Sequence, residues 1–218
     1  GRFLREEAAR AMERMPVFGA APRFLQESLL FPYAYGAAYV QALWQQHPER
    51  PPPLGPHLPR STEQVLRGPG TEPPVPVRLA RWPAGWRVAY ANNLGAWEVR
   101  LFLEEHLGAG PAARAAAEGW AGDGYALLVD TAGRDTTFAW LTLWDTEQDA
   151  QEFEDAYRAG RALHASAAAD RQRPGWVHVE RARFEGHPGR LLVEARSPRD
   201  ATFLQGLGFE LARVDGSG

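Results

Sequence analysis

The segment TTFAWLTLW, residues 136–144, constrains the fold of this chain more than any other part of the sequence. Successive residues of a β-strand point to opposite faces of the sheet. One face of this segment would carry Phe138, Trp140 and Trp144, and the other Ala139, Leu141 and Leu143. Because both faces are apolar, the strand needs cover on both sides. We therefore predict a central strand in a layered structure.

Two β-hairpins are indicated in the second half of the chain. The loop TAGRD joins a β-run over residues 125–130 to residues 136–144. The turn EGHPG joins residues 176–184 to residues 190–196. Both connections have the length and the glycine content of hairpin turns. An antiparallel arrangement of these four segments is therefore expected.

Helices are predicted after both hairpins. Thr146 stands three residues before Asp149, and apolar residues then recur at helical spacing up to Leu163. Ser197, followed by Pro198, is typical of the start of a final helix. Each hairpin with its helix forms a strand-strand-helix unit.

A weaker third unit precedes these two. Residues 75–79 and 86–90 are short strand candidates, and either Asn92 or Asn93 can cap a helix over residues 95–107. The predicted fold class is α+β, with an N-terminal helical subdomain followed by an antiparallel sheet that has helices packed on it.

The N-terminal part is predicted to be helical. Residues 3–15 carry an apolar stripe that ends at Pro16, and a second helix begins with Pro22 in its first turn. Pro32 is expected to interrupt that helix, so residues 33–46 are predicted as a separate third helix.

A proline-rich connector follows the helical part. Its prolines cannot donate backbone hydrogen bonds and favour an extended chain, and they stand at positions 51, 52, 53, 56 and 59. Ser61 and Gln64 then have the spacing of a capping box. We interpret the segment as a stiff connector between domains at residues 1–72 and 73–218, and the alternative is a PxxP ligand for a partner.

The chain between the third unit and the central hairpin is less regular. A helix is predicted over residues 112–120, and the sequence GDGY, residues 122–125, is typical of a turn that enters a strand. The alternative interpretation places Asp123 at the mouth of a cleft.

The composition excludes several classes of function. The net charge of -3 arises from 24 basic and 27 acidic residues without a long run of one sign, so neither nucleic-acid binding nor a basic membrane patch is indicated. No apolar stretch is long enough to span a membrane, and the first residues lack the apolar core of a signal peptide. All basic residues are arginine and isoleucine is absent, as expected for a high-GC bacterium.

No motif for catalysis or cofactor binding stands out. The chain has no cysteine, and no two of its six histidines lie three to five residues apart, which excludes a thiolate site and an HExxH-type helix. P-loop, GxGxxG and GxSxG motifs are absent as well. We therefore expect no catalytic residue, no cofactor and no metal site, although a site assembled from distant residues stays open.

A ligand cleft is the remaining candidate for a site. Aromatic residues where loops meet strands can line such a cleft, although they more often seal the edge of a core. His178 on a strand is more often a structural histidine than a base. The candidate cleft residues are Trp86, Trp120, Asp123, Tyr125, Trp176 and His178.

Five stretches together resemble a family of bacterial secreted or lipoprotein-type proteins whose N-terminal part carries the HExxH helix of zincin metallopeptidases. The stretches are "LLFPYAYGAAYVQAL", "RSTEQVL", "NNLGAWEVRLFL", "AAEGWAGDGYALLVD" and "LWDTEQDAQEF". The resemblance covers most of residues 25–160 and concerns the C-terminal region of that family. HExxH is absent from this chain, so no catalytic residue is carried over. The resemblance implies a cell-envelope or secreted location.

Three functions are compatible with the sequence. The first is a non-catalytic accessory or binding region of a zincin-like envelope protein, whose partner is another protein or the missing N-terminal module. The second is a fragment of an active zinc metallopeptidase whose catalytic helix lies upstream, and an HExxH motif in the upstream coding sequence would favour it. The third is a module for a small apolar ligand that uses the aromatic cleft.

Overall fold

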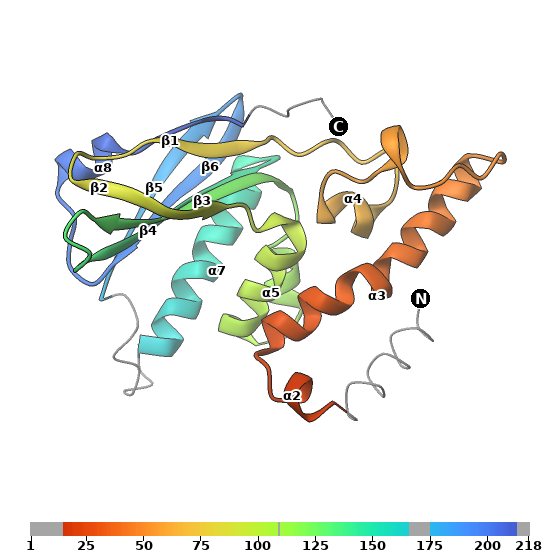
Figure 1. Cartoon of the computed structure of the whole chain (residues 1–218), viewed down its shortest axis with the longest axis horizontal. Helices are drawn as coiled ribbons and strands as arrows, with labels where there is room; N and C mark the ends of the chain where they lie inside the picture. Colours follow the sequence, from red (N-terminus) through yellow and green to blue (C-terminus); the bar gives the residue numbers. More distant parts are fainter. Residues whose placement is uncertain (1–14, 109, 166–174, 213–218) are drawn as a thin grey trace.

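The computed structural model describes residues 15–108, 110–165 and 175–212, and it shows the predicted α+β fold (Figure 1). A helical N-terminal part is followed by seven strands with helices packed on them. The predicted helix over residues 3–15 lies outside the described residues apart from Met15. The helices are α2 (Pro16–Gly19), α3 (Arg23–Gln46), α4 (Thr62–Arg67), α5 (Gly95–Leu107), α6 (Pro111–Ala115), α7 (Glu147–Ala165) and α8 (Ala201–Gly206). The strands are β1 (Val77–Arg81), β2 (Trp86–Asn92), β3 (Trp120–Asp130), β4 (Thr136–Trp144), β5 (Trp176–Phe184), β6 (His187–Ala195) and β7 (Gly208–Leu211).

Strand β4 lies in the middle of a five-stranded antiparallel sheet, which confirms the prediction from its two apolar faces. The strand order is β2-β3-β4-β6-β5. On one face Trp140 and Trp144 pack with α5, α6 and α7, and Phe153 of α7 lies at the centre of this cluster. On the other face Ala139 packs with Phe203 of α8 under the two-stranded β1-β7 ribbon. The sheet therefore has cover on both sides.

Both predicted hairpins are confirmed. Val129 of β3 pairs with Thr136 of β4 across the TAGRD loop. The second turn is tighter than expected, since β6 already begins at His187 and the turn consists of Glu185 and Gly186 alone. Both residues have positive φ, at 48° and 85°, as a two-residue turn of type I′ requires.

The predicted turn at residues 122–125 is wrong, because these residues lie inside β3. The segment that leads into β1 crosses the face of β3 at this point, and the Val75 amide donates to the Ala121 carbonyl at 2.8 Å. A Cβ atom on Gly122 would lie 2.4 Å from the Val75 carbonyl oxygen, and one on Gly124 would lie 2.3 Å from that of Val77. The glycines are therefore needed for close backbone contact and not for a turn.

Helix α3 runs without interruption through Pro32, contrary to the predicted break. The proline removes one backbone hydrogen bond, but Phe31 and Ala34 on either side of it are buried. Phe31 packs against Trp97 and Leu101 of α5. This packing holds the two halves of the helix in line. It also joins residues on both sides of the predicted domain boundary at residue 72 in one core cluster.

The proline-rich segment joins α3 to α4, both within the predicted first domain, and contains one short 3₁₀ turn at Gly55–His57. The Ser61 hydroxyl accepts a hydrogen bond from the Gln64 amide at 3.1 Å, which confirms the predicted cap. The Gln64 side chain reaches back to accept from the Arg60 amide at 2.6 Å. Helix α4 is thus fixed at its first turn by its own residues.

Two further helix boundaries differ from the prediction. Helix α6 ends at Ala115, because the chain turns at Gly119, with φ +72°, and Trp120 already belongs to β3. Helix α8 is capped by Asp200, whose carboxylate accepts from the Phe203 amide at 2.7 Å, and not by Ser197. Strand β7 was not predicted at all. Among the described helices, none is long and apolar enough to cross a membrane.

The crossing over β3 generates a prediction for Gly124→Ala. The added methyl group collides with the Val77 carbonyl, so the variant should lose about 2–4 kcal/mol in its free energy of unfolding. Urea denaturation followed by tryptophan fluorescence measures this loss. Gly36→Ala in α3 is the control, because its Cβ meets no atom of the same chain within 4 Å, and in dilute solution of single chains it should be neutral or slightly stabilising. Equal midpoints for the two variants would contradict the assigned role of Gly124.

Candidate functional site

Asp123 of β3 is a buried carboxylate, 3% exposed, that accepts four hydrogen bonds. One of its oxygens accepts from the Leu94 amide at 2.8 Å and from the Trp140 indole at 3.0 Å. The other accepts from the Gly95 amide at 2.8 Å and from the Trp120 indole at 3.2 Å. A single buried side chain therefore joins the start of α5 to two tryptophans of the sheet.

The cap of α5 comes from Asp123 and not from Asn92 or Asn93, so that part of the prediction is wrong. The helix does span residues 95–107 as expected, but its N-cap residue Leu94 has no side-chain cap of its own. A carboxylate at a helix N-terminus satisfies free backbone amides and interacts favourably with the helix dipole. Tertiary structure supplies here what a local asparagine supplies in many helices.

Two carboxyl groups near the α5 N-terminus are perturbed by burial. Burial raises the pKa of Asp123, and its four N–H donors oppose that rise. Burial also raises the pKa of Glu98 in α5 to about 7, and the nearby charge of Asp123 adds to this. One oxygen of Glu98 is buried without a hydrogen-bond partner among the described residues. Protonation of Glu98 near neutral pH avoids two buried charges side by side.

The structure divides the six predicted cleft residues among separate places. Trp120, Asp123 and Tyr125 line one pocket of about 410 Å³ beside the crossing strand. Trp86 instead packs at 5.1 Å edge to face against Phe203. Trp176 and His178 stack on each other on β5, which forms the opposite edge of the sheet from β2. We infer that Asp123 serves the core and that the six side chains do not form one cleft.

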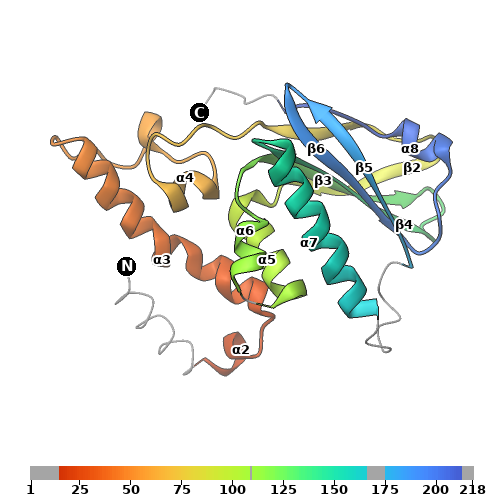
Figure 2. The ribbon, with the colours of Figure 1, turned by 180° about the vertical axis from the view of Figure 1, so that it is seen from behind.

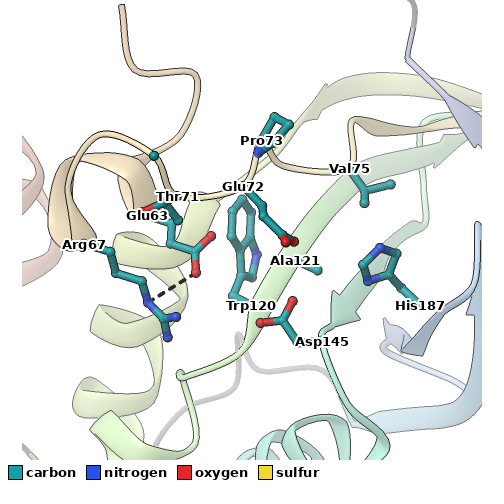
Figure 3. A pocket seen from close by; sticks show the side chains of 11 residues that line it. Glu63, Arg67, Thr71, Glu72, Pro73, Val75, Trp120, Ala121, Asp145 and His187 are labelled. Carbon is teal, nitrogen blue, oxygen red and sulfur yellow. Dashed lines mark ion pairs between the residues drawn. The ribbon is translucent and has the colours of Figure 1, made fainter. Parts of the chain in front are cut away.

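A second pocket lies on the other side of the crossing segment, between α4 and the sheet (Figure 3). We call it the acidic pocket. Its volume is about 330 Å³, which is within the range of small-ligand sites. Figure 3 shows three carboxylates around the Trp120 indole, with Arg67 on one side and His187 on the other. The lining residues are Glu63, Arg67, Gly70, Thr71, Glu72, Pro73, Val75, Trp120, Ala121, Asp145 and His187.

The charges of the acidic pocket are not balanced within it. Arg67 pairs with Glu63 at 3.4 Å, and it also reaches Glu118 outside the pocket at 2.5 Å. Among the described residues, Glu72 and Asp145 take part in no ion pair. One arginine is thus shared between two glutamates, while two further carboxylates form no ion pair with a described residue. The pocket therefore carries an excess of negative charge.

Burial and mutual repulsion shift two of these carboxyl groups. Glu63 is 8% exposed, and desolvation raises its pKa to about 7, opposed by Arg67 and increased by Asp145. Desolvation raises the pKa of Asp145 as well, with a further contribution from Asp149, and the charges of Arg67 and His187 oppose this rise. A cation placed among these groups would lower the pKa of each of them.

Sequence reasoning did not find the acidic pocket. Its charged residues come from α4, from the segment between α4 and β1, and from the ends of β4 and β6. No local spacing links Glu63 to Asp145, because only the fold brings α4 to the end of the sheet. Within the described ranges, no group of three or more histidine, aspartate or glutamate side chains is placed to hold a metal ion.

Comparison with protein families adds one assignment. Residues 86–213 match the model of a family described as a domain of unknown function, DUF8575. The chain belongs to this family. No curated protein and no solved structure matches the chain. The matched range contains Asp123 with all its bonding partners, whereas the acidic pocket takes Trp120, Asp145 and His187 from it and Glu63, Arg67 and Glu72 from the preceding part.

Asp123→Asn tests the role of the buried carboxylate. The asparagine amide would bring its own N–H groups against two of the four donors, so the variant should lose about 2–4 kcal/mol in the free energy of unfolding. Chemical denaturation measures the loss, and the near-UV circular dichroism of the two tryptophans should weaken. Glu105→Gln, at an exposed position on α5, is the control for the loss of one carboxylate charge. A loss no larger than that of the control would exclude Asp123 as the anchor of α5.

Glu63→Gln tests the electrostatics of the acidic pocket. The pKa of Glu63 is about 7 in the folded chain against an ordinary value of 4.5, so the folded state holds more protons between these pH values. The free energy of unfolding therefore falls as pH rises from 4.5 to 7. The variant should lose less stability over this interval, by on the order of 1–3 kcal/mol. Glu72→Gln, at an exposed position, should keep nearly the wild-type slope, and identical slopes for both variants would contradict the assigned pKa.

Proposed function

We propose that this chain is a non-catalytic binding module whose acidic pocket receives an organic cation, the guanidinium or amine of a basic peptide. One observation carries the proposal: the exposed Glu72 and Asp145 face the pocket without an ion pair to any described residue, beside the buried Glu63. A bound cation would supply the missing charge. The pocket volume of about 330 Å³ accommodates one side chain of this kind.

The arrangement of the pocket favours a guanidinium in particular. Planar guanidinium groups donate several hydrogen bonds in a fixed fork that matches carboxylate oxygens. Carboxylates approach the pocket from two sides, Glu72 from the segment between α4 and β1 and Asp145 from the end of β4. Trp120 and Val75 give the stem of the ligand side chain apolar walls. The acidic lining favours such a ligand over the small apolar molecule considered from the sequence.

The proposal also includes a role for this chain as one module of a larger protein assembly. The resemblance to the C-terminal region of zincin-like envelope proteins supports an accessory module that acts next to a peptidase domain. The pocket lies where the DUF8575 domain meets the helical N-terminal part, so a basic segment bound there would contact both. In this proposal the chain binds a basic peptide and contributes no catalytic group of its own.

Isothermal titration with N-acetyl-arginine methylamide tests the function, and the uncharged N-acetyl-citrulline methylamide is the matched control ligand. Binding of the arginine compound should strengthen as pH rises from about 5.5 to about 8, because the carboxyl group of Glu63, with its pKa raised to about 7, loses its proton. The double variant Glu72→Gln, Asp145→Asn should weaken binding at least tenfold, by about 1.4 kcal/mol or more.

A double variant at two exposed carboxylates outside the pocket, Glu105→Gln on α5 and Asp155→Asn on α7, controls for the loss of general negative charge. It should bind the arginine compound as the wild type does. Equal affinity for arginine and citrulline ligands, or no effect of the pocket variants, would rule out the acidic pocket as a cation site.

A further inference from the structure

Helix α3 carries an apolar face that is turned away from the rest of the protein. Figures 1 and 2 show α3 at one end of the molecule, with α5 between it and α7. Leu25, Leu29 and Tyr33 are 50%, 62% and 72% exposed, and Trp44 remains 42% exposed although its indole donates to the Pro51 carbonyl. Large apolar side chains that share one exposed face mark an interaction site.

The exposed residues lie on one side of the helix, together with the half-buried Gly36 and Val40. Steps of three or four residues keep side chains on one side of an α-helix. The stripe consists of Leu25, Leu29, Tyr33, Gly36, Val40 and Trp44, at steps of four, four, three, four and four. The opposite side of α3 buries Phe31, Ala34, Tyr39 and Leu43 against the protein. The helix is thus apolar on the face it buries and also on the face it exposes.

The stripe is also uncharged over most of its length. From Ser28 to Gln46 the helix contains no acidic or basic residue. A second helix with the same sequence therefore meets no repulsion between like charges along this stretch.

In an antiparallel pair of α3 helices the larger side chains of the stripe would face smaller ones. We place α3 antiparallel to the α3 of a second copy, with the twofold axis between Ala34 and Tyr35. Each residue before the axis then faces the residue at the same distance after it. The pairs are Leu25 with Trp44, Leu29 with Val40, and Tyr33 with Gly36. In the central pair the phenol ring of Tyr33 lies against Gly36, which has no side chain. Such contacts let two helices approach closely.

We propose that this face binds a second copy of the chain, as an antiparallel pair of α3 helices around a twofold axis. The exposed parts of the four large side chains bury on the order of 500 Å² per copy, or about 1,000 Å² in total, which is at the lower limit of specific interfaces. The dimer is therefore weak, with a dissociation constant on the order of micromolar. The acidic pocket lies outside this interface, so the inference does not depend on the proposed function.

Site-directed cross-linking tests the register, since the chain has no cysteine of its own. In the proposed dimer residue 25 of one copy faces residue 44 of the other, whereas two residues 25 lie about 28 Å apart. An equimolar mixture of Leu25→Cys and Trp44→Cys should therefore form a disulfide-linked dimer on mild oxidation. Either variant alone should form at least tenfold less. A cross-link in Leu25→Cys alone would indicate a parallel pair and overturn the proposal.

Sedimentation of the full chain tests the dimer itself. The average mass should approach twice that of the monomer between about 5 and about 500 µM. Leu29→Glu should raise the dissociation constant at least tenfold. Leu211→Glu on β7, where the leucine is 45% exposed, is the matched control and should leave the constant unchanged.

Three outcomes would overturn the proposal. The first is a monomer at the highest concentration. The second is equal effects of the two glutamate variants. The third is a chain that dimerises only after residues 1–14 are removed, because that segment of the same chain would then be the one that covers the face.

Discussion

The carboxylate of Asp123 is the interaction on which the arrangement of the layers depends. It lies inside β3, yet two of its four donors are backbone amides of the N-cap and first residue of α5, and the other two are indoles of β3 and β4. A buried carboxylate is tolerated only when its charge is compensated by donors, so the helix and the sheet cannot separate without exposing an unsatisfied group. Helix α5 in turn carries Trp97, and α3 packs against this side chain.

The position of the acidic pocket depends on a close contact between the backbone around Val75 and that of β3. Because Gly122 and Gly124 have no side chains, the segment around Val75 can lie directly on β3. This position brings Glu72 to the end of the sheet, where Asp145 leaves β4 and α4 presents Glu63. The excess of carboxylates in the pocket thus results from one contact between two distant segments. The same crossing separates the acidic pocket from the pocket beside Tyr125.

Most regular elements could be predicted because their determinants are local. The two apolar faces of TTFAWLTLW required a central strand, and the spacing of Ser61 and Gln64 marked the start of α4. The errors arose where a distant contact replaced a local signal. Pro32 stays inside a helix because its neighbours are buried against α5, and GDGY is a strand because another backbone crosses it. The prediction of one aromatic cleft relied on residue type alone, which does not indicate the face or the edge on which a side chain lies.

The sequence by itself determined the α+β class, the hairpins and the absence of known catalytic motifs, since periodicity, turn residues and motif spacing are properties of neighbouring residues. The tertiary structure alone decided the cap of α5, the acidic pocket and the exposed face of α3. Each of these depends on which segments far apart in the chain come into contact. Whether a carboxylate meets four donors or none, and whether an apolar stripe is buried or exposed, is fixed only by those contacts.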